Sequence, residues 1–321
     1  MESIITCSNV TRTFISRTLL GKKREVHALN GLDFDVDKGI IFGLLGPNGS
    51  GKTTTVRILS TLLTPTSGQA RVLGFDVVKE ASGIRKKIGL ILGGERGLYG
   101  RLTGRENLRY FAALNHLNRE ITKNRIQEIL ETVGLTSGSE RPVEQYSRGM
   151  RQRLHVARGL LNDPDILFMD EPTIGLDPIG AEELHQLLPQ LLSRGKTILL
   201  TTHYMSEADK LCDRIAIIDK GKIIASGTPM NIRRQFSKVA ILEIILRTSQ
   251  SDTIEKLQEI ETTIRVDSEP DGPIQRLTIQ TLPNVDIREE VTAILGSDNI
   301  ESMVSRDPTL EETYLSIFKS S

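Results

Sequence analysis

The chain has 321 residues, enough for one large domain with its own core and a second, smaller domain. Lysine plus arginine and aspartate plus glutamate number 41 each, so the chain has no global positive field that would recruit nucleic acid. Two cysteines are too few for a disulfide framework or a metal cluster, and no apolar run approaches the roughly 18–20 residues of a membrane span. We therefore expect a soluble protein from a reducing compartment, without a signal peptide, whose membrane role would come through a partner.

Short apolar segments alternate with amphipathic segments of helical length up to about residue 228, which predicts an α/β domain. A longer helical block at about residues 106–161 interrupts this alternation. The glycine-rich segment 134–138 and Pro142 divide the block into at least three helices. The strands that we expect are residues 32–36, 40–45, 69–73, 88–92, 166–170, 197–202, 214–218 and 223–226.

The pattern changes after Thr228 and Pro229. Alternating or apolar segments at about 239–247, 264–266, 274–279 and 300–305 predict strands, whereas about 252–260, 285–295 and 310–318 predict helices. The resulting order, β-α-β-β-α-β followed by a helix, suggests a small α+β accessory domain of ferredoxin-like fold. We place the nucleotide-binding domain at residues 1–230 and the accessory domain at 231–321.

A glycine-rich loop lies between the strand 40–45 and a helix that begins near Thr54. It fits the G-x-x-x-x-G-K-[ST] pattern at every fixed position, and such a loop turns several backbone N–H groups and a helix N-terminus toward one anion. Lys52 supplies positive charge to the β- and γ-phosphates, and the Thr53 hydroxyl is placed to ligate Mg²⁺. The predicted nucleotide-binding residues are Gly46, Pro47, Asn48, Gly49, Ser50, Gly51, Lys52, Thr53 and Thr54.

Two adjacent carboxylates end the buried strand 166–170. Parallel strands present their carboxyl ends to the ligand crevice, so Asp170 is expected to reach the Mg²⁺ that Thr53 ligates. We expect Glu171, one residue on, to point the other way and to orient a water toward the γ-phosphate. His203 follows the strand 197–202, where it can donate a hydrogen bond to the γ-phosphate or to the attacking water.

Upstream of Asp170, the segment 147–153 resembles the signature motif of ATP-binding cassette (ABC) ATPases. The family's motifs run in the order aromatic loop, Walker A, Q-loop, signature, Walker B, D-loop and H-loop. This chain offers Phe14, 46–53, the region around Gly94, 146–150, 166–171, 175–177 and His203 in that order. The resemblance covers about residues 1–230 and implies a P-loop NTPase cassette with a helical subdomain at about 100–162.

The resemblance also implies a head-to-tail homodimer with two ATP molecules, each with Mg²⁺, at its interface. Each nucleotide would be held by the phosphate loop of one subunit and by the signature of the other. In this chain the signature residues are Ser147, Arg148, Gly149 and Met150, and Asp177 belongs to the D-loop. Lys52, Glu171 and His203 would carry catalysis. Phe14 would stack on the adenine ring, although an ordinary core phenylalanine is an equal alternative.

This chain departs from the family pattern in two places. The common signature Leu-Ser-Gly-Gly-Gln is replaced here by Tyr-Ser-Arg-Gly-Met, which keeps the serine and the second glycine; Arg148 either adds charge near phosphate or faces solvent. The expected Q-loop glutamine falls on Gly94, which has no side-chain ligand, with Glu95 beside it. Glu95, a water molecule or another part of 93–100 would have to take its place.

The C-terminal segment 308–315 and the segment 102–108 resemble the ABC-2 exporter subgroup, of the daunorubicin-resistance-like type. This resemblance implies an ATP-hydrolysing subunit that works with separate ABC-2 type transmembrane permease subunits at the cytoplasmic face of the cell membrane. The alternatives are a soluble ABC ATPase acting on ribosomes or DNA, and an importer ATPase. The single cassette, the absence of sustained heptads and the charge balance disfavour ribosome and DNA partners, so no nucleic acid partner is expected.

Overall fold

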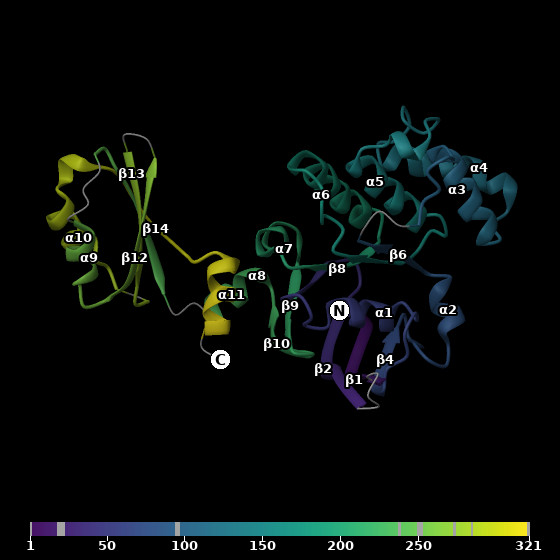
Figure 1. The fold of residues 1–321 in the computed structure, drawn as a ribbon, viewed down its shortest axis with the longest axis horizontal. Helices are drawn as coiled ribbons and strands as arrows, with labels where there is room; N and C mark the ends of the chain where they lie inside the picture. Colours follow the sequence, from purple (N-terminus) through teal and green to yellow (C-terminus); the bar gives the residue numbers. More distant parts are fainter. Residues whose placement is uncertain are drawn as a thin grey trace. The chain divides into compact units, whose positions relative to one another are not determined.

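The computed structural model describes residues 2–17, 23–93, 97–236, 239–248, 253–271, 274–283 and 285–319. The chain forms two compact units, Met1–Thr228 and Pro229–Ser321 (Figure 1). Each unit has a hydrophobic core of its own. Across the described ranges, no helix is both long enough and apolar enough to cross a membrane.

A six-stranded sheet in the order β10-β9-β3-β8-β7-β6 is the centre of the first unit. Its parallel strands are β3 (Ile41–Leu45), β6 (Ile88–Leu92), β7 (Ile166–Asp170), β8 (Thr197–Thr202) and β9 (Arg214–Asp219), and β10 (Lys222–Gly227) pairs antiparallel to β9 at the edge. Every residue of β3, β7 and β8 is buried, as expected for parallel strands covered on both faces. The prediction of these six strands is therefore confirmed.

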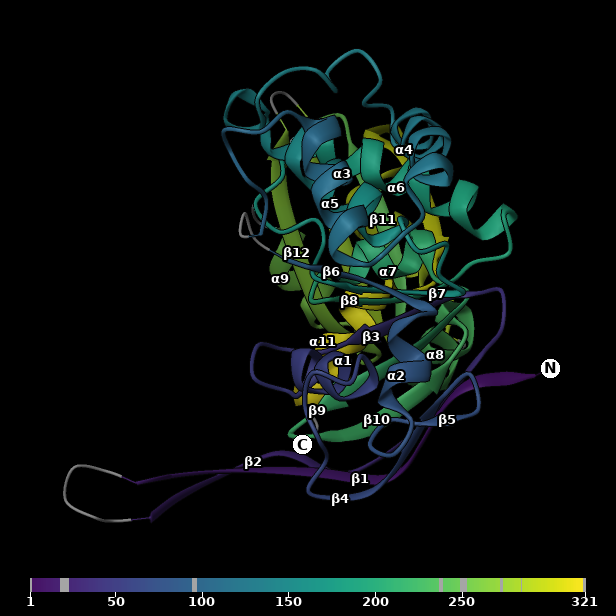
Figure 2. The same cartoon turned by 90° about the vertical axis from the view of Figure 1, so that its right-hand side faces the viewer.

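A second, antiparallel sheet in the first unit has the order β2-β1-β4-β5. Its strands are β1 (Ser3–Arg17), β2 (Lys23–Asp37), β4 (Ser67–Val72) and β5 (Phe75–Asp76). Figure 2 shows β1 and β2 as a long ribbon that extends beyond the other elements of this unit. The sequence predicted only 32–36 and 69–73 here, because register shifts such as that between Cys7 and Val10 break the alternation that marks a strand.

The helices of the first unit are α1 (Lys52–Leu59), α2 (Ala81–Arg85), α3 (Gly104–Leu114), α4 (Arg119–Thr132), α5 (Arg148–Gly159), α6 (Pro178–Ser193) and α7 (Met205–Leu211), with a 3₁₀ turn at Val143–Gln145. The expectation of at least three helices in this block is confirmed, but both predicted breaks, 134–138 and Pro142, lie in the single connection between α4 and α5. An additional break lies between α3 and α4, where His116 takes a positive φ of 56°. No glycine or proline marks that break in the sequence, so the sequence pattern predicted one continuous helix there.

The second unit contains α8 (Pro229–Phe236), β11 (Ala240–Leu246), α9 (Thr253–Gln258), β12 (Thr263–Asp271), β13 (Ile274–Thr281), α10 (Arg288–Leu295), β14 (Ile300–Arg306) and α11 (Leu310–Lys319), with a 3₁₀ turn at Ser297–Asn299. Its antiparallel sheet has the order β12-β13-β11-β14. Leu242, Ile244 and Leu246 of β11 share a core with residues of α9 and α10, so both helices cover the same face of the sheet. The predicted order of strands and helices after residue 239 is confirmed.

Candidate active site at the edge of the parallel sheet

The loop of residues 46–51 connects β3 to α1 at the carboxyl edge of the six-stranded sheet. A Cβ atom at Gly46 would collide with the carbonyl oxygen of Ile218, and Gly51 has a φ of 116°, so both positions require glycine. The Ser50 hydroxyl is buried and has no hydrogen-bond partner in the part of the chain that the structure describes. A tight loop with an unpaired buried donor ahead of a helix N-terminus fits a phosphate group.

Lys52 lies folded against its own loop. Its ammonium group donates to the carbonyl oxygens of Gly46 (2.7 Å) and Pro47 (3.2 Å) and lies 3.3 Å from Oε1 of Glu171. Oε2 of Glu171 lies 3.3 Å from Nδ1 of His203. One carboxylate therefore connects the phosphate loop to the end of β8.

The expectation that Glu171 points away from Asp170 is wrong. Strand β7 ends at Asp170, and Glu171 has a φ of 49°, which takes it out of the alternation of the strand. The two carboxylates instead reach the adjacent residues Lys52 and Thr53. Because both lie beside the phosphate loop, they can act on the same nucleotide.

Asp170 accepts hydrogen bonds from two hydroxyl groups. Thr53 Oγ1 donates to Oδ2 at 2.8 Å, and Thr201 Oγ1 donates to Oδ1 at 2.6 Å. The sequence had not singled out Thr201, although a hydroxyl at the end of the neighbouring parallel strand is the signal that would have found it. The hydroxyl of Thr53 and the carboxylate of Asp170 are oxygen ligands of the kind that Mg²⁺ prefers, so the residues present fit that ion.

The signature residues begin helix α5. Ser147 is the N-cap and accepts a hydrogen bond from Met150 N at 3.1 Å, and the guanidinium of Arg148 donates to the carbonyl oxygen of Gly175 at 3.2 Å. Asp177 caps α6 by accepting from Gly180 N at 2.6 Å, and a Cβ at Gly149 would lie 3.4 Å from Cα of Gly180. The structure thus brings the signature and the D-loop together within one subunit.

The aromatic ring of Phe14 is on the β1–β2 ribbon. It is 39% exposed, and the guanidinium carbon of Arg12 lies 4.7 Å from the ring centre. The alternative that Phe14 is an ordinary core residue is therefore wrong. Gly94 and Glu95, the candidates for the Q-loop position, lie outside the described residues.

These features define a P-loop nucleoside triphosphatase. The phosphate loop follows a central strand and carries a lysine at the start of its helix. A hydroxyl–carboxylate pair lies beside it, next to a second carboxylate and a histidine. Comparison with known proteins narrows this class. A family model described as "ABC transporter" matches residues 29–174. The daunorubicin resistance ATP-binding protein DrrA3 of Streptomyces coeruleorubidus is 40% identical over 90% of this chain and 90% of that protein.

Two further relatives agree. The linearmycin resistance ATP-binding protein LnrL of Bacillus subtilis is 39% identical over 70% of this chain and 71% of that protein. The ATP-binding cassette MJ0796, solved as a dimer in a post-hydrolysis state with ADP and Pi, matches with a TM-score of 0.61 and 28% identity over 70% of this chain and 98% of that chain. This chain belongs to the ABC transporter family. It is the ATP-binding subunit of an exporter of the daunorubicin-resistance-like subgroup, and an ATPase coupled to transport.

Proposed function

We propose that ATP hydrolysis takes place at the carboxyl edge of the six-stranded sheet, with Lys52, Glu171 and His203 as catalytic residues. The observation that carries this proposal is the continuous set of contacts from the phosphate loop through Lys52 and Glu171 to His203. Glu171 orients the attacking water. His203, at the same edge, contacts the γ-phosphate or that water.

Residues 46–54 hold the phosphates through backbone N–H groups and the N-terminus of α1. Lys52 moves its ammonium group from the carbonyls of the loop to the β- and γ-phosphates. Thr53 and Asp170 hold Mg²⁺, which stabilises negative charge on the phosphate oxygens when it is bound. The exposed ring of Phe14 offers a stacking surface for adenine.

We infer a head-to-tail homodimer in which Ser147, Arg148, Gly149 and Met150 of one subunit face the nucleotide of the other. Ser147 is the N-cap of α5, so its hydroxyl lies at the N-terminus of that helix, where an anion is stabilised. Asp177 fixes the start of α6 beside it. ATP binding then favours the closed dimer and hydrolysis favours its opening, a population shift set by differential binding.

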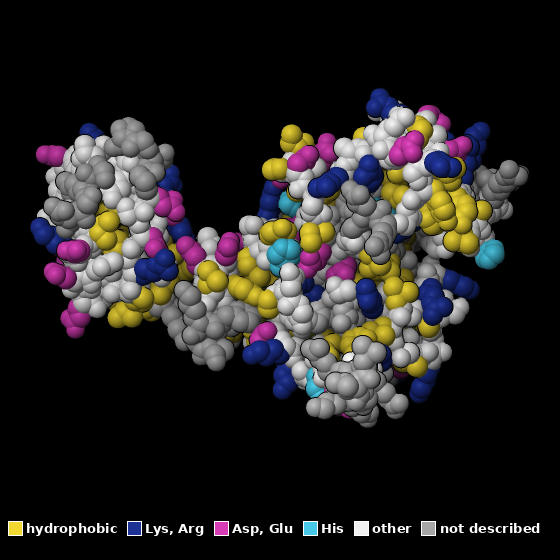
Figure 3. Space-filling model, in the orientation of Figure 1, with side chains coloured by type: hydrophobic (Ala, Val, Ile, Leu, Met, Phe, Trp, Pro, Cys, Tyr) yellow, Lys and Arg dark blue, Asp and Glu magenta, His cyan; other side chains and the backbone are white. Residues whose placement is uncertain are grey.

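The partner that uses this motion is an ABC-2 type permease, and we place its contact on the helical part of the first unit. Figure 3 shows hydrophobic side chains gathered over α3 and α4. Tyr99, Tyr110 and Leu114 in and beside α3 are 47%, 42% and 62% exposed, and aromatic groups of this kind are enriched at protein interfaces. The subunit would then sit at the cytoplasmic face of the membrane.

The second unit is proposed to be a ferredoxin-like accessory domain that steadies the dimer. The order β-α-β-β-α-β and the sheet order β12-β13-β11-β14 support that fold. Arg306 connects β14 to β11 through Glu243 at 2.8 Å and to α11 through Glu312 at 2.9 Å. This bridge fixes the last helix to the sheet within the same unit.

The cargo is assigned to the permease. The relatives' names refer to daunorubicin resistance in one case and to linearmycin resistance in another, at 40% and 39% identity. ATP-binding subunits of similar sequence therefore carry names that refer to different drugs. We propose that this chain supplies the energy for drug export and that the membrane subunits select the drug.

Size-exclusion chromatography of Glu171→Gln with and without Mg-ATP tests the proposed function. The amide keeps the size of the side chain but no longer orients the water, so ATP stays bound and a dimer accumulates. Glu259→Gln, at an exposed acidic residue that follows α9, is the matched control and should not accumulate an ATP-dependent dimer. Fast ATP hydrolysis by Glu171→Gln would contradict the role of Glu171.

A further inference from the structure

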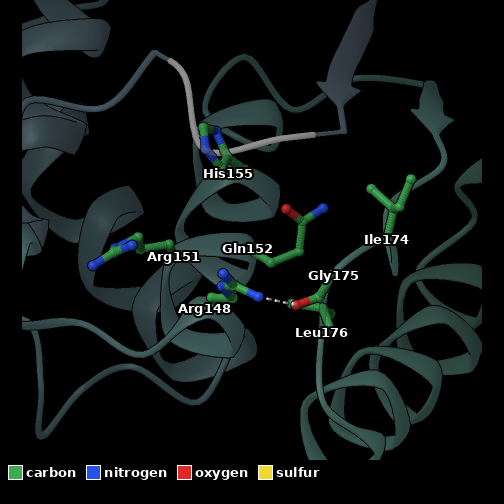
Figure 4. Close-up of a pocket in the computed structure, with 7 residues that line it drawn as sticks. All are labelled: Arg148, Arg151, Gln152, His155, Ile174, Gly175 and Leu176. Atoms are coloured by element: carbon green, nitrogen blue, oxygen red, sulfur yellow. Dashed lines mark hydrogen bonds between the residues drawn. The ribbon is translucent and has the colours of Figure 1, made fainter.

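A cavity of about 310 Å³ lies between helix α5 and the segment 174–176 (Figure 4). One wall is formed by Arg148, Arg151, Gln152 and His155. These positions are related as i, i+3, i+4 and i+7, so a single face of α5 presents all four polar side chains. Among the described residues that line the cavity, none carries a carboxylate.

Three nitrogen atoms beside this cavity are buried without a hydrogen-bond partner in the part of the chain described. They are Nε2 of Gln152 and both ring nitrogens of His155. The two residues are 6% and 1% exposed. A buried unpaired polar group costs about 1–3 kcal/mol, so three of them in adjacent turns of one helix indicate a missing hydrogen-bonding partner or water at this place.

The charges around the cavity favour an anion. The guanidinium of Arg148 reaches the carbonyl oxygen of Gly175 on the opposite wall, and that of Arg151 donates to the carbonyl oxygen of Glu144 at 3.3 Å. The guanidinium of Arg148 therefore stands where an anion in the cavity would meet it, whereas that of Arg151 extends away from the segment 174–176 (Figure 4) and adds positive charge nearby. The volume exceeds the roughly 30 Å³ of a water molecule several-fold, so a small oxyanion with part of its hydration fits.

We propose that this cavity binds inorganic phosphate. A tetrahedral oxyanion accepts hydrogen bonds in four directions, which suits donors from guanidinium, amide and imidazole groups, whereas a planar carboxylate would leave some donors unpaired. The proposal depends on the proposed function only for the source of the ligand, because ATP hydrolysis releases phosphate in this subunit. The segment 174–176 follows closely on Glu171 in the chain.

Thermal unfolding with and without phosphate tests the proposal. Mg²⁺ and adenylyl imidodiphosphate are kept saturating, so that the phosphate loop is filled and cannot account for the response. The variants are Gln152→Met and His155→Phe, which keep the side-chain volume and remove the nitrogens. Both should fold at least as well as the parent protein, because they remove unpaired buried polar groups. Gln186→Met, at an exposed glutamine of α6, is the matched control.

We expect phosphate to raise the unfolding midpoint of the parent protein and of Gln186→Met by about 2–4 °C, saturably. Sodium chloride of equal ionic strength should not do so, and Gln152→Met and His155→Phe should not respond. If phosphate has no specific effect on the parent protein, the cavity holds water only and the proposal fails. It also fails if both cavity variants respond as the parent protein does.

The same samples separate this proposal from the proposed function. A rise of the midpoint with the nucleotide alone reports the phosphate loop, and its absence would count against the proposed function and not against the cavity. Turnover measured with added phosphate identifies the source. If added phosphate changes the turnover of the parent protein but not that of either cavity variant, the site is assigned to phosphate released by hydrolysis. If phosphate raises the unfolding midpoint but leaves turnover unchanged, the site is assigned to phosphate from solution.

Discussion

At the scale of single residues, the charged groups of the candidate site are paired with one another. Lys52 is only 4% exposed, and its charge is balanced by two loop carbonyls and by Glu171. A buried ammonium without such partners would be costly, so these contacts maintain the loop until phosphate replaces them. Asp170 is held in the same way by the hydroxyls of Thr53 and Thr201. In the proposed function, phosphate oxygens take the place of the partners of Lys52, so that ATP binding is an exchange of partners.

Replacing Lys52 by alanine tests this exchange. The variant loses charge-assisted hydrogen bonds to the phosphates worth about 1.5–3 kcal/mol, so ATP affinity should fall by about 10–100-fold. Isothermal titration with the non-hydrolysed analogue measures the loss directly. Lys79→Ala, at an exposed lysine after β5, should bind nucleotide as the parent protein does. Equal affinities of the two variants would contradict the placement of Lys52 on the β- and γ-phosphates.

His155 gives the molecule a pH dependence of known sign. Burial, aided by the positive charge of Arg158, lowers its pKa from 6.5 to about 4, and Arg148 and Arg151 stand on the same cavity wall. The unfolded chain binds the proton of His155 more tightly than the folded chain does. The contribution of the neutral imidazole to the free energy of unfolding is therefore complete above pH 6.5 and is lost as the pH falls toward about 4.

The difference in pKa corresponds to roughly 3 kcal/mol over that whole interval and about 2 kcal/mol at pH 5. Urea unfolding of the parent protein and of His155→Phe at pH 7 and pH 5 measures it. The parent protein should lose more stability than the variant between these two values. Parallel losses would show that the imidazole is not held neutral.

At the scale of elements, the two N-caps of α3 and α5 allow a capping role to be separated from a role at the dimer interface. Thr103 caps α3 in a capping box with Glu106, and Ser147 caps α5. Replacing either by alanine should cost about 1 kcal/mol of stability. Only Ser147→Ala should also weaken the ATP-dependent dimer in the background of Glu171→Gln, measured by analytical ultracentrifugation. Equal effects of the two substitutions on dimerisation would leave Ser147 with a capping role alone.

Elements fixed by burial or by a chemical motif could be predicted from the sequence, and elements fixed by tertiary contacts could not. The strand β7 and the phosphate loop are continuous apolar and glycine patterns, so local chemistry determines both. The outer parts of β1 and β2 were not predicted, because bulges interrupt the alternation of apolar and polar residues and because Ile15 and Val26 are exposed. The contact of Arg148 with Gly175 joins segments that are distant in the chain, and the turn of Glu171 depends on a positive φ that its residue type does not favour. Neither leaves a local pattern in the sequence.

At the scale of the whole molecule, the two units have separate cores. The nucleotide contacts that we propose all belong to the first unit, because the phosphate loop, Asp170, Glu171 and His203 lie within Met1–Thr228. Ligand binding stabilises the structure that it contacts by an amount set by ligand concentration and affinity. The second unit, whose core includes Leu277, is not stabilised by nucleotide binding unless the two units unfold cooperatively.

Differential scanning calorimetry should therefore resolve two transitions, and Mg²⁺ with the non-hydrolysed ATP analogue should raise only one of them. Leu277→Ala identifies the other, because removing a fully buried leucine side chain costs about 2–5 kcal/mol and lowers the midpoint of the unit that holds it. If the nucleotide raises the transition that Leu277→Ala lowers, the two units unfold as one cooperative structure. The accessory unit would then share in the energetics of ATP binding, and its task would extend beyond steadying a dimer.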